Sequence, residues 1–315
     1  VRLAGVPALV VGLIPGLLLL PLYRSRQATF SLAAYPPLRP VAPPSRTDLV
    51  LEPSRPDLKT DVYAPEGPGP HPFVVVIHSG AWRSGDKGEG ADASWAMARA
   101  GHVVLDVQYR LTPGNRFPSA VADVKCLLGR ARERAAELQL DPDRGAYLGR
   151  SAGGEIALVA AYSAGDPRVA PSCDVPDRPV TSVVSLYGPT DLAWGYVNLI
   201  RPDVVTGSRA LDAYLGGPPA DFPEAYRLAS PVAWVDRPLP RTLLVHGTAD
   251  RLVSVENERR LARALQAAGR SVEVLELPLA DHGFDAHAGG LAEQLARHVL
   301  LRFLAEDQGA AASRP

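Results

Sequence analysis

A serine flanked by small residues stands directly after an apolar run. In the stretch YLGRSAGGEIA, residues 147–157, Gly149, Ser151 and Gly153 match the pattern G-x-S-x-G. Between a strand and a helix this pattern indicates a nucleophile, because the sharp turn exposes the hydroxyl and small neighbours let backbone segments approach. A helix N-cap is the alternative interpretation of the same serine. The rest of the chain must supply the groups that activate a hydroxyl.

A serine hydroxyl is a weak nucleophile without an adjacent base, and the base needs a carboxylate to orient it. Asp250, in LVHGTADRLV, follows one apolar run, and His282, in LADHGF, follows the next. With Ser151 these residues would form a catalytic triad. The sequence therefore predicts nucleophilic catalysis, with His282 as the base and Asp250 as the group that holds its imidazole.

Four neighbouring residues are rivals for the last two roles. His287 lies in a predicted helix, where a solvated position is favoured, and His246 ends a predicted strand, where packing is favoured. Asp281 and Asp285 flank the chosen histidine, but aspartates in loops usually cap or form turns. The triad assignment is therefore retained.

Attack on an acyl carbon also requires donors for the developing oxyanion. The stretch HSGAW, residues 78–82, directly follows the apolar run FVVVI. We expect the amides of Gly80 and Ala81, with that of Ala152 after the nucleophile, to form the oxyanion hole. Trp82 is the candidate substrate-binding side chain, with a place in the core as the alternative. For the whole stretch, an ordinary Ser-Gly turn is the other interpretation.

Short apolar runs alternate with helical patterns through the body of the chain, which predicts an α/β fold with a mostly parallel central sheet and helices on both faces. The expected strands are continuous apolar runs at 73–78, 102–109, 145–149, 180–188, 241–247 and 271–278. The expected helices are 90–100, 119–139, 152–164, 254–269 and 286–305. Residues 190–238 interrupt the alternation, and we expect a lid over the strand ends or a long connection there.

With these motifs the chain resembles the hormone-sensitive-lipase-like esterases and the neighbouring feruloyl-esterase-like and acetyl-esterase group of the α/β-hydrolase superfamily. HSGAW resembles the H-G-G-G-W loop of that group, and GRSAGGEIAL resembles its G-x-S-A-G-G elbow. YRL (109–111) and FP (117–118) match two further short motifs, LVHGTADRLV matches the acid loop, and the order Ser, Asp, His is that of the superfamily. Ser79 and Ala81 depart from the glycines that the group often has.

This resemblance covers residues 50–305 and implies the α/β-hydrolase fold. It also implies hydrolysis of short-chain esters through an acyl-enzyme, with no metal or organic cofactor. The favoured function is therefore a serine carboxylesterase acting on a small-molecule ester. An amide-directed hydrolase, either an arylformamidase or a small peptidase, and a non-catalytic binding module are the alternatives. A formal net charge of −1 argues against nucleic acid as a partner.

The two cysteines, Cys126 and Cys173, have neither metal-ligand nor redox-motif spacing. We expect two buried free thiols, with a single disulfide as the alternative.

The first segment differs from the rest, because no charged residue occurs from Leu3 to Leu22. A helix of about 20 residues spans the hydrocarbon core of a bilayer. Residues 1–26 therefore predict a membrane anchor, with a cleaved signal peptide, and hence secretion, as the first alternative and a buried soluble helix as the second. Arginines that follow the segment outnumber those before it, which favours a cytoplasmic domain by a small margin and leaves the side of the membrane open.

The remaining organisation follows from composition. Residues 27–47 include a proline-rich stretch and predict a semi-rigid linker. Residues 48–306 form the predicted hydrolase domain, and residues 307–315 have no periodic pattern, which predicts a disordered tail. Nothing in the sequence indicates the oligomeric state.

Overall fold

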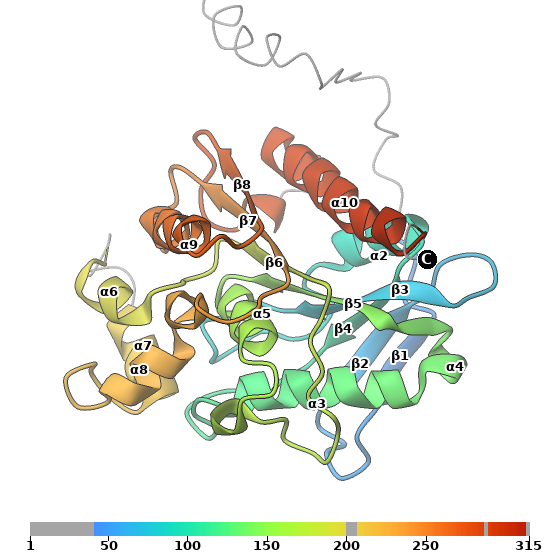
Figure 1. Ribbon diagram of the computed structural model, residues 1–315, viewed down its shortest axis with the longest axis horizontal. Helices are drawn as coiled ribbons and strands as arrows, with labels where there is room; N and C mark the ends of the chain where they lie inside the picture. Colours follow the sequence, from blue (N-terminus) through green and yellow to red (C-terminus); the bar gives the residue numbers. More distant parts are fainter. Residues whose placement is uncertain (1–40, 200–206, 287–288, 313–315) are drawn as a thin grey trace, which may run out of the picture. The chain divides into compact units, whose positions relative to one another are not determined.

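The computed structural model describes residues 41–199, 207–286 and 289–312 (Figure 1). The predicted anchor, residues 1–26, and all but the last residues of the predicted linker lie outside these ranges. Among the residues that are described, no helix is long and apolar enough to cross a membrane.

Eight strands form a single sheet in the order β1-β2-β4-β3-β5-β6-β7-β8. β2 is antiparallel to both β1 and β4, and every other neighbouring pair is parallel. The strands are β1 Arg46–Val50, β2 Lys59–Tyr63, β3 His71–Ile77, β4 Val103–Val107, β5 Leu140–Arg150, β6 Ser182–Leu186, β7 Arg241–Gly247 and β8 Val272–Leu277. This mostly parallel sheet is consistent with the predicted α/β-hydrolase fold.

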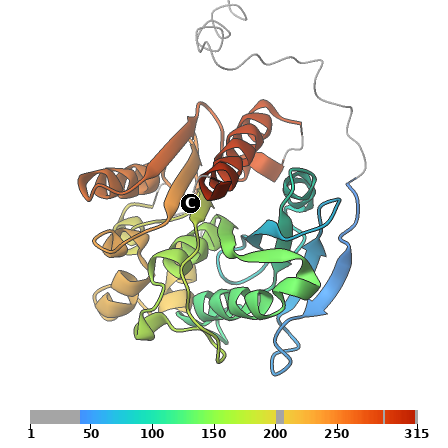
Figure 2. The same ribbon diagram turned by 45° about the vertical axis from the view of Figure 1, so that its right-hand side comes forward.

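Helices cover both faces of the sheet, as Figures 1 and 2 show. On one face, α3 Ser119–Glu133, α5 Ala152–Tyr162 and α9 Glu256–Ala267 pack against the sheet. On the other face lie α2 Ala91–Arg99 and α10 Leu291–Ala312. The short helix α4 Ala135–Leu138 leads into β5.

The alternation of side chains along a strand explains why the predicted strands are apolar throughout. Along β3, Val75 and Ile77 face the core beneath α3 and α5, whereas Val74 and Val76 face the core beneath α2 and α10. Both sets are at most 1% exposed. A strand covered on both faces needs no polar residue, so a continuous apolar run identifies it. All six predicted strands are confirmed, as β3 to β8.

The antiparallel edge, β1 and β2, lies outside the predicted alternation. These strands read RTDLV and KTDVY, in which charged residues interrupt the apolar positions. Because β1 is an edge strand with exposed residues, it does not carry the apolar run typical of the buried strands.

The α10 helix also differs from expectation: it continues to Ala312, into the segment predicted to be disordered. Alanines 310–312 have high helix propensity and extend it.

The interrupting segment, residues 190–238, is largely helical. It forms α6 Leu192–Val197, α7 Gly207–Leu215, α8 Pro223–Ala229 and the 3-10 helix η3 Pro231–Trp234. The other 3-10 helices are η2 Pro167–Val169 and η4 Phe284–Ala286. In Figure 1, α6, α7 and α8 form a group at one end of the sheet.

Cys126 and Cys173 form a disulfide, so the expectation of two free thiols is wrong. Cys126 lies on α3, and the loop after η2 returns to this helix, where the amide of Ser172 donates to the carbonyl of Ala122 at 2.9 Å. The Cα atoms of the cysteines are 5.4 Å apart across a sequence separation of 47. Spacing in the sequence could not reveal a contact that the return of this loop creates.

Candidate active site

The turn at Ser151 joins β5 directly to α5. Its φ and ψ are 52° and −119°, a backbone conformation that non-glycine residues rarely adopt. The surrounding backbone is too close for side chains: a Cβ atom on Gly149 would lie 1.9 Å from the carbonyl oxygen of Gly153. A Cβ on Gly153 would lie 2.4 Å from the carbonyl oxygens of Ile77 and His78. The small residues of the motif therefore permit a strained turn that presents the serine hydroxyl.

The three predicted triad residues meet at the carboxyl ends of β5, β7 and β8. Nε2 of His282 lies 2.9 Å from Oγ of Ser151, and Nδ1 lies 2.7 Å from Oδ2 of Asp250. The other carboxylate oxygen of Asp250 accepts hydrogen bonds from the amides of Leu252 and Val253 at 2.8 and 2.9 Å. The arrangement provides a hydroxyl, a base that can take its proton, and a carboxylate that orients the base.

Burial and hydrogen bonding act in opposite directions on Asp250. Burial raises the pKa of this carboxyl, but hydrogen bonds from His246 and His282 outweigh burial and hold the pKa well below its usual range. Asp250 therefore stays ionised at neutral pH, as a group that stabilises a protonated imidazole must.

The loop that contains the predicted oxyanion donors has an unusual backbone. Gly80, Ala81 and Trp82 have φ values of 109°, 51° and 60°. Hydrogen bonds hold the start of this loop. The amide of Ser79 donates to Glu89 at 2.5 Å, and the hydroxyl of Tyr109 lies 3.2 and 3.3 Å from the carbonyl oxygens of His78 and Ser79, which accept from it. These contacts hold the two residues directly before the strained segment.

The predicted donors differ in their position. Ala81 and Ala152 line a cavity beside Ser151, whereas Gly80 lies outside its lining. The amide of Ala152 belongs to the first turn of α5, where amides have no acceptor within the helix. Within the described part of the chain, the amide of Ala81 donates to no acceptor either. The turn itself requires glycine at position 80, because a Cβ there would lie 2.0 Å from the carbonyl oxygen of Ser84.

Trp82 is both part of the core and part of the cavity wall. It is 5% exposed, its ring stacks on Tyr214 with centroids 4.5 Å apart, and it lines the cavity beside Ser151. Its indole N–H donates to the buried carboxyl of Glu155 at 2.9 Å. The two interpretations of this residue therefore do not exclude each other.

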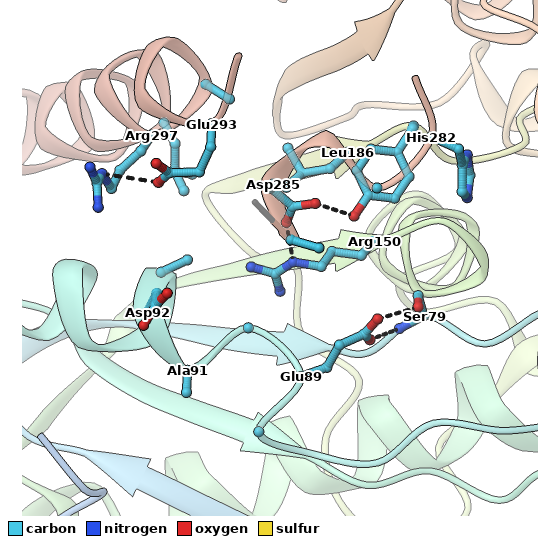
Figure 3. A pocket seen from close by; sticks show the side chains of 18 residues that line it. Ser79, Glu89, Ala91, Asp92, Arg150, Leu186, His282, Asp285, Glu293 and Arg297 are labelled. Atoms are coloured by element: carbon cyan, nitrogen blue, oxygen red, sulfur yellow. Dashed lines mark hydrogen bonds and ion pairs between the residues drawn. The ribbon is translucent and has the colours of Figure 1, made fainter. Parts of the chain in front are cut away.

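Two cavities adjoin His282. The one that contains Ser151 has a volume of about 150 Å³ and mostly apolar walls, many of which come from the helical segment 190–238. Its lining includes Ala81, Trp82, Ala152, Pro189, Leu192, Leu199, Ala210, Leu211, Leu252 and Val253. The other cavity, of about 250 Å³, lies beside α2 and α10 and is rich in charged side chains (Figure 3). Its lining includes Ser79, Glu89, Asp92, Arg150, Tyr187, Asp285, Glu293 and Arg297.

Among the described residues, one group has the spacing of metal ligands: Glu52, Cys126 and Cys173. Its two sulfur atoms are bonded to each other and offer no thiolate, so the group does not fit a metal ion.

A match to known proteins agrees with this geometry. The family model described as BD-FAE matches residues 60–265, which include Ser151, Asp250 and the predicted oxyanion loop. The chain belongs to the BD-FAE family. The match ends before His282, which the structure adds to the site.

Curated relatives of this BD-FAE family member are named as esterases. Esterase LipC of Mycobacterium tuberculosis is 33% identical over 249 residues, which cover 75% of this chain and 58% of LipC. Esterase LipQ of the same organism is 30% identical over 267 residues, covering 82% of this chain and 60% of LipQ. The chain thus spans about three fifths of the length of these relatives.

A solved structure is similar over nearly its whole length. It is a thermophilic esterase of Thermogutta terrifontis, Est2, with bound propionate. The TM-score is 0.68 and the sequence identity 27%, and the match covers 86% of this chain and 96% of the Est2 chain.

Three side chains of this BD-FAE site have no signal in the sequence. His246, for which packing was favoured, is completely buried, and its Nε2 lies 3.0 Å from Oδ2 of Asp250. Glu155 holds Trp82, and Asp285, which was expected to cap or form a turn, pairs with Arg150. The contacts of Glu155 and Asp285 join residues far apart in the chain, so only folding reveals them, whereas His246 and Asp250 are four residues apart.

Proposed function

We propose that this protein is a serine carboxylesterase that hydrolyses short-chain acyl esters through an acyl-enzyme. The observation that carries the proposal is the continuous set of hydrogen bonds from Ser151 through His282 to Asp250. The esterase names of its relatives LipC and LipQ support ester hydrolysis.

In the proposed reaction, Ser151 Oγ attacks the acyl carbon while Nε2 of His282 takes the hydroxyl proton. The amides of Ala81 and Ala152 donate to the oxyanion of the tetrahedral intermediate. When the intermediate collapses, the ester bond breaks and the leaving alcohol takes the proton from His282. Water then attacks the acyl-enzyme with the same base, which releases the acid and restores Ser151.

The cavity beside Ser151 supports the short-chain preference. At about 150 Å³, it lies below the usual range for sites that hold drug-sized ligands. Propionate, which is bound in the Est2 structure, is a short-chain acid that suits a cavity of this size. We propose that the acyl group occupies this cavity, with Trp82 and the residues of segment 190–238 as its walls.

The test is hydrolysis of p-nitrophenyl esters from acetyl to dodecanoyl, with matched p-nitroanilides and with Ser151→Ala. We expect activity that is highest with short acyl chains, is weak or absent on the anilides, and falls about 10⁴-fold or more in the variant. Activity that survives in a folded Ser151→Ala protein would exclude the mechanism, and faster anilide than ester turnover would favour an amide-directed enzyme.

We propose that residues 1–26 anchor the protein in a membrane, with the hydrolase domain on the oxidising side. The disulfide between Cys126 and Cys173 supports this side, since such bonds persist in oxidising compartments. It runs against the cytoplasmic orientation that the arginines favour by a small margin. Membrane fractionation tests the anchor. Protease accessibility of the hydrolase domain in intact cells tests the side of the membrane.

A further inference from the structure

We infer that Arg150 and Tyr187 are positioning residues for the catalytic base, because together they hold Asp285 on the loop that carries His282. This inference rests on the proposed function and adds to it a set of residues that act through His282. The three side chains line the cavity of about 250 Å³ beside α2 and α10, and Figure 3 shows the bond between Arg150 and Asp285.

Asp285 uses both carboxylate oxygens in this arrangement. Oδ2 accepts a hydrogen bond from Nε of Arg150 at 2.6 Å, and Oδ1 accepts one from the hydroxyl of Tyr187. A charge-assisted hydrogen bond on each oxygen holds a carboxylate in both position and rotation. Because Asp285 follows His282 by three residues, the loop beside the imidazole is held as well.

The two donors, Arg150 and Tyr187, lie at the carboxyl ends of neighbouring strands of the sheet. Arg150 is the last residue of β5 and directly precedes Ser151. Tyr187 directly follows β6, and its amide donates to the carbonyl of Val245 on β7 at 2.8 Å. Both therefore project from the carboxyl end of the sheet, whereas their acceptor lies in the short 3-10 helix η4 that follows His282. Through these contacts, the ends of β5 and β6 hold the segment that contains His282 in place.

Tyr187 also touches the base directly. Its ring packs edge-on against the imidazole of His282, with centroids 4.7 Å apart, and against Phe284, with centroids 5.2 Å apart. The hydroxyl of Tyr187 fixes Asp285 while its ring limits the tilt of the imidazole. One side chain thus contacts three residues of this segment, His282, Phe284 and Asp285.

The ion pair between Arg150 and Asp285 is largely buried, and replacing one partner of a buried pair has a large effect. The Arg150 and Asp285 side chains are 4% and 13% exposed. Burial lowers the pKa of Arg150, but the charge and hydrogen bond of Asp285, together with Tyr187 and Asp106, outweigh burial and raise it. The guanidinium lies against Gly90, where a Cβ would come within 2.3 Å of Nη2. Because both side chains are largely withdrawn from solvent, loss of either one leaves the other without its ion-pair partner.

A second ion pair on the same loop provides a matched control. Arg251 pairs with Asp281, the residue before His282, but the side chain of Arg251 is 71% exposed. Exposed ion pairs contribute little to holding a structure, because water competes for both charges. Arg251→Gln should therefore affect the base far less than Arg150→Gln.

The experiment measures kcat and KM of the full chain for p-nitrophenyl acetate with Arg150→Gln, Asp285→Asn, Tyr187→Phe and the Arg150→Gln/Asp285→Asn double variant. Displacing a base by about 1 Å costs on the order of 100-fold in rate. We expect kcat to fall about 100-fold in the first two variants and less in Tyr187→Phe, which keeps the ring. KM should change less than kcat, and Arg251→Gln should stay near the wild-type rate.

The double variant distinguishes positioning from separate structural effects. If the pair acts as one unit, the double variant should be no slower than the slower single variant, whereas independent effects would multiply. Each variant is compared below its own thermal unfolding temperature, so that a lower rate does not reflect unfolded protein. Tyr187→Phe, the conservative change, keeps the test open if a charge variant does not fold.

Three results would overturn the inference. The first is a kcat within about twofold of wild type in folded Arg150→Gln and Asp285→Asn. The second is a multiplied loss in the double variant. The third is a loss in Arg150→Gln that appears with one leaving alcohol and not another, which would make Arg150 a substrate-binding residue. Wild-type activity and an inactive Ser151→Ala protein, measured in the same assay, separate these results from failure of the proposed function.

Discussion

The indole of Trp82 donates a hydrogen bond of 2.9 Å to Glu155, on the same helix that begins after Ser151. The hydroxyl of Tyr214, on α7, donates to the same carboxyl oxygen at 3.2 Å. A single buried carboxyl thus joins the oxyanion loop, the nucleophile helix and the helical segment that walls the cavity. Its ionisation affects all three.

Glu155→Gln should make the protein more resistant to rising pH. Burial raises the pKa of Glu155 from 4.5 to about 8, against the hydrogen bonds from Trp82 and Tyr214. Between these values the folded state holds a proton that the unfolded state has lost, so wild-type stability falls as pH rises. The free energy of unfolding of the variant, minus that of wild type, should therefore rise by up to about 1.4 kcal/mol per pH unit from pH 5 to 8.

Urea denaturation at each pH unit measures this difference. The exposed Glu66→Gln change is the control, and its difference from wild type should not depend on pH in the same way. A constant difference between Glu155→Gln and wild type across the range would mean that Glu155 is ionised throughout.

His246→Gln should destabilise the protein most at low pH. Burial lowers the pKa of His246, but the carboxylates of Glu258 and Asp250 outweigh it and raise the pKa to about 10. Because the folded pKa exceeds the unfolded value of 6.5, this stabilisation is complete below pH 6.5 and is lost as pH rises toward 10. Removing one partner of a buried pair costs about 3–5 kcal/mol.

Denaturation at pH 6 and pH 9 should show the larger loss for His246→Gln at pH 6. The His246→Gln/Glu258→Gln double variant removes both members of the pair and should recover part of the loss, since no uncompensated charge remains at position 258. An equal loss at the two pH values would contradict a cationic His246.

Gly153→Ala should disturb the oxyanion loop. The added Cβ would lie 2.4 Å from the carbonyl oxygens of Ile77 and His78, and backbone atoms cannot rotate away as a side chain can. We expect the loop after β3 to shift, with a fall in kcat of about 10-fold or more, since loss of one oxyanion donor costs about 10²–10³-fold.

Steady-state kinetics with p-nitrophenyl acetate measures the effect. Gly114→Ala is the matched control, because a Cβ there meets no atom within 4 Å and the backbone is not left-handed. If Gly153→Ala were as active as Gly114→Ala, the close approach of α5 to this loop would have no catalytic consequence.

Replacing both cysteines should lower stability without changing catalysis. The disulfide closes a loop with a sequence separation of 47, for which the chain-entropy relation gives about 4 kcal/mol. It joins α3 to the loop after η2 and contributes nothing to the lining of either cavity beside His282. Cys126→Ser/Cys173→Ser should therefore unfold at lower urea and keep its kcat while folded.

Dithiothreitol provides the internal control for this prediction. It should lower the unfolding midpoint of the wild type toward that of the double variant and leave the double variant unchanged. A wild-type midpoint that does not respond to reduction in partly unfolding conditions would indicate that the bond contributes little.

The sequence alone predicted the parallel sheet and the triad because both depend on local patterns. Strands covered on both faces are continuous apolar runs, so Val74 to Ile77 identify β3 whatever their neighbours. Ser151 needs small residues around it, and Asp250 and His282 lie in loops directly after such runs. Their order along the chain, combined with the superfamily resemblance, was sufficient to select them.

Tertiary structure decided what depends on contacts between distant segments. The bond between Cys126 and Cys173 exists because a loop returns to α3, and the pairing of Arg150 with Asp285 exists because β5 ends beside the loop after β8. In the sequence, Asp285 resembles any loop aspartate, and Glu155 resembles an exposed position on a helix. Whether a charged side chain is solvated, paired or neutral depends on what surrounds it in space, and no local pattern specifies those surroundings.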